Sequence, residues 1–199
     1  MGYWRKMIRY LNNLSEKRRA TFAGILILTA YLLLVTDATD SRIIGFLADA
    51  LSGLSVIGIA VLLYPLFVGE SKTISLGYLV ARSFEGLLMI LSGIFVLLDN
   101  YESRNFIYDN IHIYTFIAGS GFLYWLLYKT LIVPRFISVW GFVAVFFLFL
   151  NTILGLFEIS SGLLDSTLAL IVTNEIFLAV WLMTKGLALN TQPRLSNNS

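Results

Sequence analysis

The stretch Ile74–Leu98, ISLGYLVARSFEGLLMILSGIFVLL, decides the fold class of this chain. It is a mostly apolar run, and about 20 such residues are enough for a helix to cross a bilayer. Arg82 and Glu85 interrupt the run three positions apart, so they lie on one face of that helix. Charges at membrane depth are costly and turn toward a partner or a cavity. We therefore expect further membrane helices to cover the face that carries Arg82 and Glu85.

The composition indicates an integral membrane protein without a metal or redox cofactor. Hydrophobic residues make up 58% of the 199 residues and charged residues only 13%, whereas soluble domains carry about 25% charge. The chain has no cysteine, and His112 is its single histidine. These residues cannot supply a disulfide framework or the ligands of a zinc, haem or iron–sulfur site. We predict no cofactor and no metal site, and nothing in the sequence indicates a nucleic-acid partner.

Apolar runs that alternate with short polar segments predict an all-α fold, a polytopic bundle of six transmembrane helices. Ser15 and Glu16 are typical of a helix start, with the serine as N-cap. Residues 188–199 are predicted to be a loose tail. The predicted membrane domain covers 15–187, with approximate spans at 20–36, 43–68, 74–98, 111–133, 136–157 and 163–186.

Two segments outside the predicted spans are candidate contact surfaces. In residues 1–14 the apolar side chains form one stripe of a helix, and Arg5, Lys6 and Arg9 occupy the other side. This pattern is typical of an amphipathic helix in the headgroup plane, and a solvated tail is the alternative. Residues 99–110, DNYESRNFIYDN, are the longest predicted loop, polar with aromatic residues, and suit a position among the headgroups.

The charges of the loops predict that both termini are cytoplasmic. The segment before the first span holds six of the fourteen Lys and Arg residues, and the segments after the even-numbered spans hold five more. The loops after the odd-numbered spans hold only Arg42 and Arg104, beside six acidic residues. Because basic loops stay on the cytoplasmic side, the odd-numbered loops are expected to face outward.

Three groups of motifs carry a family resemblance: Gly77-Tyr78 with Arg82 and Glu85; Tyr128-Lys129 followed by PRFISVWG at 134–141; and Glu175 followed by Trp181-Leu182 and Lys185-Gly186. Together they resemble the bacterial integral membrane family catalogued as domain of unknown function 4386, from about residue 17 to residue 186. The pattern Pro-Arg-x-x-Ser-x-Trp-Gly is the most specific of them. The resemblance implies six helices and a bacterial cytoplasmic (inner) membrane, and it implies no assigned reaction.

Counting about 1.5 Å of helix per residue places several polar residues near the middle of the bilayer. Arg82 lies roughly 12 Å from the cytoplasmic side, and Glu85 and Glu175 both lie roughly 17 Å from it. Asp49 and Asn151 fall in the outer half by the same count. We predict an intramembrane polar site with an outer polar track above it; the site comprises Arg82, Glu85, Asn174 and Glu175, and the track comprises Asp49 and Asn151.

The charges of the predicted site do not balance. If Arg82, Glu85 and Glu175 are all ionised, one negative charge is left over, and in a low dielectric a proton or a bound cation has to neutralise it. Such an arrangement fits a proton-linked carrier or an amine-binding pocket. It fits equally well an interhelical clamp that fixes helix register, with one acid simply neutral.

Two further motifs are not assigned a catalytic role. His112 begins the fourth predicted span and is expected at the outer headgroups. Residues 118–121, Ala-Gly-Ser-Gly, are similar to the serine motif of rhomboid proteases. However, His112 and Ser120 lie roughly 12 Å apart on one helix, too far for a base and its nucleophile. We expect close helix packing at this motif and predict no catalytic residue.

Five residues near the inner ends of the last three spans are interpreted as loop and anchor residues: Tyr128, Pro134, Arg135, Trp140 and Lys185. Aromatic belts at the membrane interface account for the tyrosine and the tryptophan. Pro134 stops one helix and Arg135 opens the next, where it either contacts a lipid phosphate or is simply a basic loop residue.

Three functions remain open from the sequence. A non-catalytic assembly or interaction protein, which the sequence slightly favours, needs the polar layer only to lock the bundle, with 1–14 or the 99–110 loop as contact surfaces. A small-solute or proton-linked binding or transport protein would use Arg82, Glu85 and Glu175, although six helices without an obvious inverted repeat are few for a carrier. A lipid-modifying enzyme would use the acids for acid–base chemistry. A pocket in the polar layer favours binding, and a closed, fully paired layer favours assembly.

Overall fold

The computed structural model describes residues 15–157 and 167–188. The predicted amphipathic helix 1–14 and nearly all of the predicted tail 188–199 lie outside this part of the chain. Within the described ranges the fold is all-α, without a strand. The helices are α2 (Glu16–Ala30), α3 (Leu33–Asp37), α4 (Arg42–Phe67), α5 (Lys72–Leu97), α6 (Tyr101–Ile107), the π-helical turn η1 (Tyr108–His112), α7 (Ile113–Thr130), α8 (Arg135–Gly155) and α10 (Thr167–Thr184).

Polar side chains cap the helices where the sequence changes from loop to apolar run. Ser15 accepts a hydrogen bond from the backbone N–H of Arg18 at the start of α2. Ser41 and Ser71 make the same i to i+3 contact at the starts of α4 and α5. Such caps satisfy one of the free N–H groups in the first helical turn. They fix where α2, α4 and α5 begin.

The interpretation of residues 99–110 as a loop is wrong, because the chain is helical from Tyr101. The side chain of Asn100 accepts a hydrogen bond from the N–H of Ser103 at 3.0 Å and caps α6. The helix then continues through η1 into α7, so that Tyr101–Thr130 is one apolar segment of 30 residues. The turn between α5 and α6 contains Asp99, whose φ of 59° reverses the chain within a few residues.

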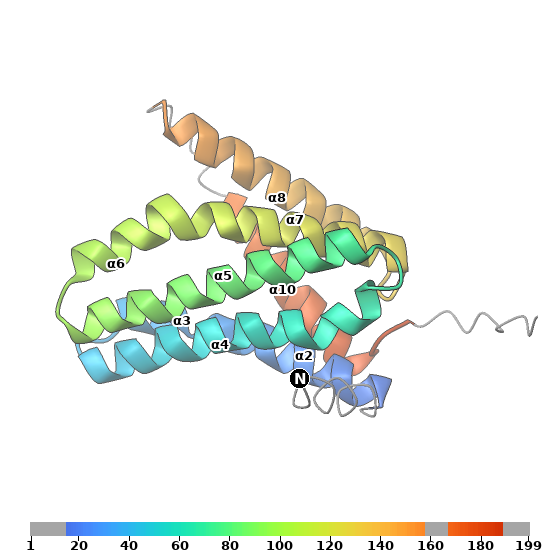
Figure 1. Cartoon of the computed structure of the whole chain (residues 1–199), viewed down its shortest axis with the longest axis horizontal. Helices are drawn as coiled ribbons and strands as arrows, with labels where there is room; N and C mark the ends of the chain where they lie inside the picture. The colour runs from blue at the N-terminus through green and yellow to red at the C-terminus, as the bar shows by residue number, and fades with distance from the viewer. Residues whose placement is uncertain (1–14, 158–166, 189–199) are drawn as a thin grey trace, which may run out of the picture.

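The helices close into a ring. Each long helix packs against the next one along the chain, in the order α2, α4, α5, α7, α8 and α10, and α10 packs back against α2 (Figure 1). The described part of the first crossing is broken at Tyr31 and Leu32, which form turns between α2 and α3. The ring therefore surrounds a central space into which several helices can direct side chains.

The pair α4 and α5 makes the closest contact in the ring. A side chain at Gly53 would collide with the carbonyl oxygen of Gly86, and one at Gly86 would collide with the carbonyl of Gly53. The face of α4 that packs there consists of small or short buried residues: Gly45, Ala48, Asp49, Ser52 and Gly53. Small residues allow membrane helices to approach at backbone distance. This contact fixes the position of Arg82 and Glu85 on α5.

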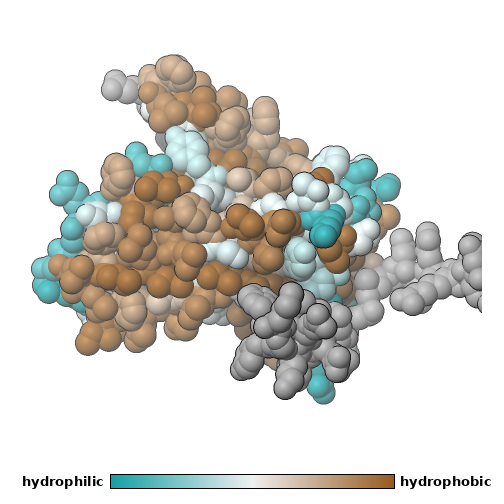
Figure 2. All heavy atoms as spheres, in the orientation of Figure 1, coloured by the Kyte–Doolittle hydropathy of each residue, from teal (hydrophilic) through white to brown (hydrophobic). Residues whose placement is uncertain are grey.

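The surface is that of a membrane protein. Figure 2 shows a band of apolar side chains between two hydrophilic ends. In the described ranges, five helical segments are long and apolar enough to cross a bilayer, and Leu168–Thr184 of α10 is a shorter apolar helix. The start of α2, the α4–α5 turn, the α7–α8 turn and the end of α10 lie together at one end of the ring (Figure 1). The described parts of the basic segments named above therefore share one end of the molecule.

Candidate functional site

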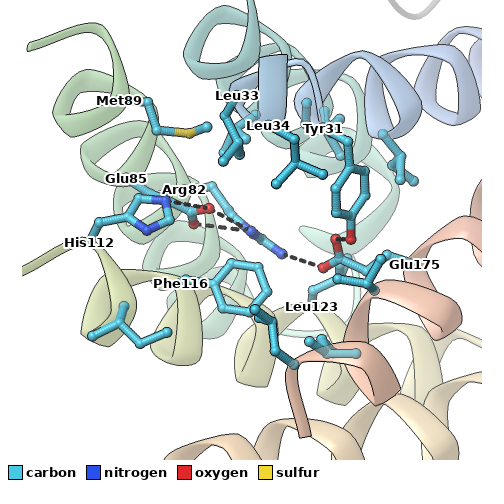
Figure 3. A pocket seen from close by; sticks show the side chains of 18 of the residues that line it. Tyr31, Leu33, Leu34, Arg82, Glu85, Met89, His112, Phe116, Leu123 and Glu175 are labelled. Atoms are coloured by element: carbon cyan, nitrogen blue, oxygen red, sulfur yellow. Dashed lines mark hydrogen bonds and ion pairs between the residues drawn. The ribbon is translucent and has the colours of Figure 1, made fainter. Parts of the chain in front are cut away.

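A cavity of about 270 Å³ lies inside the ring, near the middle of the helices. Its lining side chains come from α2, α3, α4, α5, η1, α7 and α10, whereas α8 contributes none. Most of the wall is aliphatic or aromatic, and the polar groups converge on one region (Figure 3). A mostly apolar cavity with a few convergent polar groups is the usual form of a small-molecule site.

Arg82 lies at the centre of the polar region. Its Nη1 donates to both carboxylate oxygens of Glu85 at 3.0 Å. Its Nη2 donates to Oγ of Ser120 at 2.9 Å and lies 3.6 Å from Oε1 of Glu175. The guanidinium carbon is 5.3 Å from the centre of the Phe116 ring. Arg82 thus connects α5 with α7 and α10 and lies between two carboxylates.

The two carboxylates extend this contact into a row of polar residues across the cavity. On one side, Nε2 of His112 is 3.9 Å from Oε1 of Glu85. On the other side, the hydroxyl of Tyr31 donates to Oε2 of Glu175 at 2.8 Å. The row therefore runs in the order His112, Glu85, Arg82, Glu175, Tyr31 (Figure 3). Its members come from four separate segments of the chain.

Local features of the sequence bring these side chains together. Arg82 and Glu85 meet because they are three residues apart on one helix. Gly119 gives room to the arginine, since a Cβ there would lie only 2.9 Å from Cδ of Arg82. Tyr31 reaches Glu175 from the break that ends α2. His112 lies in the π-helical turn η1, a feature that often occurs at functional sites.

The site is not fully paired. Oε1 of Glu175 and Nε2 of His112 are buried and have no hydrogen-bond partner among the described residues. Arg82 is the one Lys or Arg among the described lining residues, whereas Glu85 and Glu175 both line the cavity. Buried polar atoms normally find partners. A ligand in the cavity could supply hydrogen-bond partners for these two atoms and a charge that balances the surplus acid.

The structure separates Asn174 from the other three residues of the predicted polar site. Asn174 is fully buried, and its Nδ2 donates to the carbonyl oxygen of Ile137 at 3.1 Å. It therefore joins α10 to α8 and does not line the cavity. Ser120, for which helix packing was expected, accepts a hydrogen bond from Arg82 instead. The expected headgroup position of His112 is wrong, because its side chain lines the cavity and is only 13% exposed.

Of the two predicted outer polar residues, Asp49 belongs to a second buried cluster, which includes an unexpected member. Asp49 is fully buried and accepts from Nε of Arg104 at 3.0 Å and from the hydroxyl of Thr36 at 2.7 Å. Nη1 of Arg104 also donates to Asp37 at 2.7 Å. Arg104, which the sequence placed in a loop among the headgroups, is thus buried and joins α6 to α3 and α4. Asn151 is on α8, which packs on α7 and α10, and is separate from this cluster.

The five predicted loop and anchor residues do not line the cavity. Pro134 precedes α8 as its N-cap residue. The guanidinium of Arg135 lies 5.5 Å from the ring centre of Tyr128, and the ring of Trp140 lies 5.9 Å from that of Phe177. Lys185 follows the end of α10. These contacts join α7, α8 and α10 at the end of the ring that carries the basic segments.

The described residues contain no group of three His, Cys, Asp or Glu side chains that could hold a metal ion. The polar row can instead form hydrogen bonds with an organic molecule, and its two carboxylates and one guanidinium can balance one positive charge on that molecule.

Comparison with known proteins gives a family without an activity. The model of the domain of unknown function DUF4386 matches residues 27–105. This match confirms the resemblance predicted from the sequence and supports membership of that family; it includes Arg82, Glu85 and Arg104. It does not extend to the 134–141 motif or to Glu175. No curated protein and no solved structure matches the chain.

Proposed function

Starting from the match of residues 27–105 to DUF4386, a family of unknown function, we propose that this protein binds a small, largely apolar molecule inside the membrane. The observation that carries the proposal is the cavity of about 270 Å³ with an ionic row at its polar end. An engineered cavity of about 150 Å³ in another protein holds one benzene molecule. This cavity therefore has room for an organic molecule of roughly twice that size.

The state of the polar row supports binding over a purely structural role. Unpaired buried polar atoms cost free energy, and most of those among the described residues, such as Oδ1 of Asn174, do not line the cavity. Glu175 and His112 each have such an atom and both line the cavity, where a ligand can contact them. The assembly role, with residues 1–14 as a contact surface, stays a prediction. The second predicted contact surface would then be helical, because residues 101–110 form a helix.

The position of the cavity supports a ligand that enters from the bilayer. Two lining residues are also strongly exposed on the apolar surface: Leu34 on α3 is 58% exposed and Leu168 on α10 is 55% exposed. In a membrane these side chains face acyl chains. A ligand dissolved in the bilayer would therefore reach the cavity between α3 and α10 without crossing water.

The same proposal includes a location and an orientation. The basic segments at one end of the ring support a cytoplasmic position for that end and for both termini. The family resemblance supports a bacterial cytoplasmic membrane. A test by cysteine labelling is direct because the chain has no cysteine of its own. A cysteine at Lys72 should react only from the cytoplasmic side, and one at Asp40 only from outside; the reverse pattern would refute the orientation.

Binding is tested with a neutral probe, naphthylmethanol, and the protein in lipid nanodiscs. Equilibrium dialysis against empty nanodiscs should show saturable binding of about one probe per protein. Ala30→Phe places a large side chain in the cavity wall and should weaken binding at least tenfold. Ala118→Phe makes the same change at an exposed position of α7 and should leave binding unchanged. Non-saturable binding, or equal affinity in Ala30→Phe and the parent, would refute the proposed function.

A further inference from the structure

The charges that line the cavity point to the chemical class of its ligand. We propose that the ligand is a monovalent organic cation: an ammonium group, carried on an apolar body, that binds beside Glu175. This inference rests on the proposed function and adds to it the charge of the molecule that is bound. It makes a prediction that a neutral, purely apolar ligand would not meet.

The first argument is the charge balance of the cavity wall. The ionisable groups that face the cavity are Arg82 and Glu85 from α5, Glu175 from α10, His112 and Tyr108 from η1, and Tyr31 at the end of α2. With the histidine and tyrosines neutral, two carboxylates face one guanidinium. In a low dielectric such a surplus is neutralised either by a proton on one acid or by a counterion. A ligand with one positive charge completes the balance, whereas a ligand carboxylate would double the excess.

The neighbouring cluster does not cancel this surplus. Arg104 already pairs with the buried Asp49 and with Asp37. That cluster likewise contains two acids and one base, so it supplies no spare positive charge. The excess at Glu85 and Glu175 therefore has to be neutralised within the cavity itself.

The second argument is the geometry of Glu175. Its Oε2 accepts the hydroxyl of Tyr31, whereas Oε1 is buried without a hydrogen-bond donor. Arg82 is the nearest cation to Oε1, but its Nη2 lies 3.6 Å away, beyond a good hydrogen bond. Oε1 is therefore the acceptor that remains for an N–H group. A charged N–H donor on a carboxylate is among the stronger hydrogen bonds.

The third argument is the aromatic wall. The rings of Tyr31, Tyr108 and Phe116 line the cavity around the polar row. Aromatic faces attract cations, and the effect increases when water is excluded. The guanidinium of Arg82 already lies over Phe116. Tyr31 lies at the Glu175 end of the row, and the ring of Tyr108 lies 4.9 Å from that of His112 at the other end. An ammonium group beside Glu175 therefore has both a carboxylate and an aromatic side chain in reach.

The test compares three probes that share one ring system: naphthylmethylamine, naphthylmethanol and naphthoate, which are cationic, neutral and anionic at neutral pH. Binding to the parent protein in nanodiscs of zwitterionic lipid is measured by equilibrium dialysis, with empty nanodiscs subtracted. The amine should bind at least tenfold more tightly than the alcohol, and naphthoate more weakly than either. Because this comparison uses the parent protein, it does not depend on any variant.

Two matched variants assign the preference to Glu175. Glu175→Gln removes the surplus charge but keeps an oxygen that can accept from Tyr31, so it should reduce the preference for the amine to less than threefold while the alcohol still binds. Glu102→Gln makes the same change at an exposed position outside this cavity and should leave the preference intact.

The outcomes separate this inference from the proposed function. Equal affinities for the amine and the alcohol in the parent would overturn the cation inference and leave intramembrane binding standing. Tighter binding of naphthoate would overturn it as well. A preference for the amine that persists in Glu175→Gln would refute the role of Glu175. If none of the probes binds saturably, the proposed function fails together with the inference.

Discussion

Replacing Asp49 by asparagine tests whether the outer ionic cluster holds the ring together. The carboxylate of Asp49 is fully buried and pairs with Arg104, whose side chain is only 4% exposed. Asparagine keeps the shape and the contact with Thr36 but removes the charge. The guanidinium of Arg104 would then remain buried with Asp37 as its one acidic partner among the described residues, and the side chain of Asp37 is 63% exposed.

The expected loss in the free energy of unfolding follows from the burial of the Asp49–Arg104 ion pair. Removing one partner of a buried ion pair costs about 3–5 kcal/mol, because the other charge is left uncompensated. Asp37 still contacts Arg104, so we expect a value near the lower limit, about 3 kcal/mol. Asp99→Asn is the matched control, because it breaks the ion pair between Arg42 and Asp99, in which both side chains are 53% exposed. Exposed pairs contribute about 0–1 kcal/mol.

The measurement is the free energy of unfolding in mixed micelles with an increasing fraction of dodecyl sulfate, followed by circular dichroism. The double variant Asp49→Asn/Arg104→Gln should be less destabilised than the sum of the two single variants, since the second change removes the stranded charge. If Asp49→Asn and Asp99→Asn shift the unfolding free energy equally, the burial argument is refuted.

Two further substitutions test packing and the polar row by the same unfolding measurement. Gly141→Ala places a methyl group inside the ring of Tyr124 and should lower the free energy of unfolding by about 1–3 kcal/mol. The control Gly155→Ala, with open space around the new methyl group, should not lower it. Equal stability of the two variants would contradict the packing of Gly141 against Tyr124. Tyr31→Phe removes the hydrogen bond to Glu175 and should cost about 1.5–3 kcal/mol, as expected for a bond to a charged group; a stability equal to that of the parent would mean that the bond does not form.

The all-α fold could be predicted because apolar length is a strong signal. Arg82 and Glu85 are adjacent by helical spacing alone, whereas the contact of Arg82 with Glu175 depended on comparing depths along two helices. Comparing depths along the helices placed Arg82 and Glu175 in the same layer of the membrane, but depth does not give the direction of each side chain. It therefore grouped Asn174 with Glu175, although neighbouring residues on a helix point to different sides, and Asn174 faces α8.

The sequence predicts Asp49 in the outer layer but not its partner Arg104, because the polar composition of residues 99–110 indicates a loop. Asn100 followed by Glu102 is a cap followed by an acidic first turn, and this signal could have predicted α6. With the helix in place, Arg104 becomes a charge on an apolar segment that requires a partner. The π-helical turn that directs His112 into the cavity has no comparable signal in a single sequence.

The pairing of Arg82 with Glu85 within one helix has a consequence for biogenesis. An isolated charge at the centre of a membrane helix costs roughly 2.5–3.5 kcal/mol during insertion, but α5 enters the bilayer with its two charges already joined. Glu175 has no such partner on α10. It follows the first five crossings out of the ribosome, when Arg82 and Tyr31 are already in place. Because α10 is synthesised last, Glu175 joins the ring when its partners Arg82 and Tyr31 are already present.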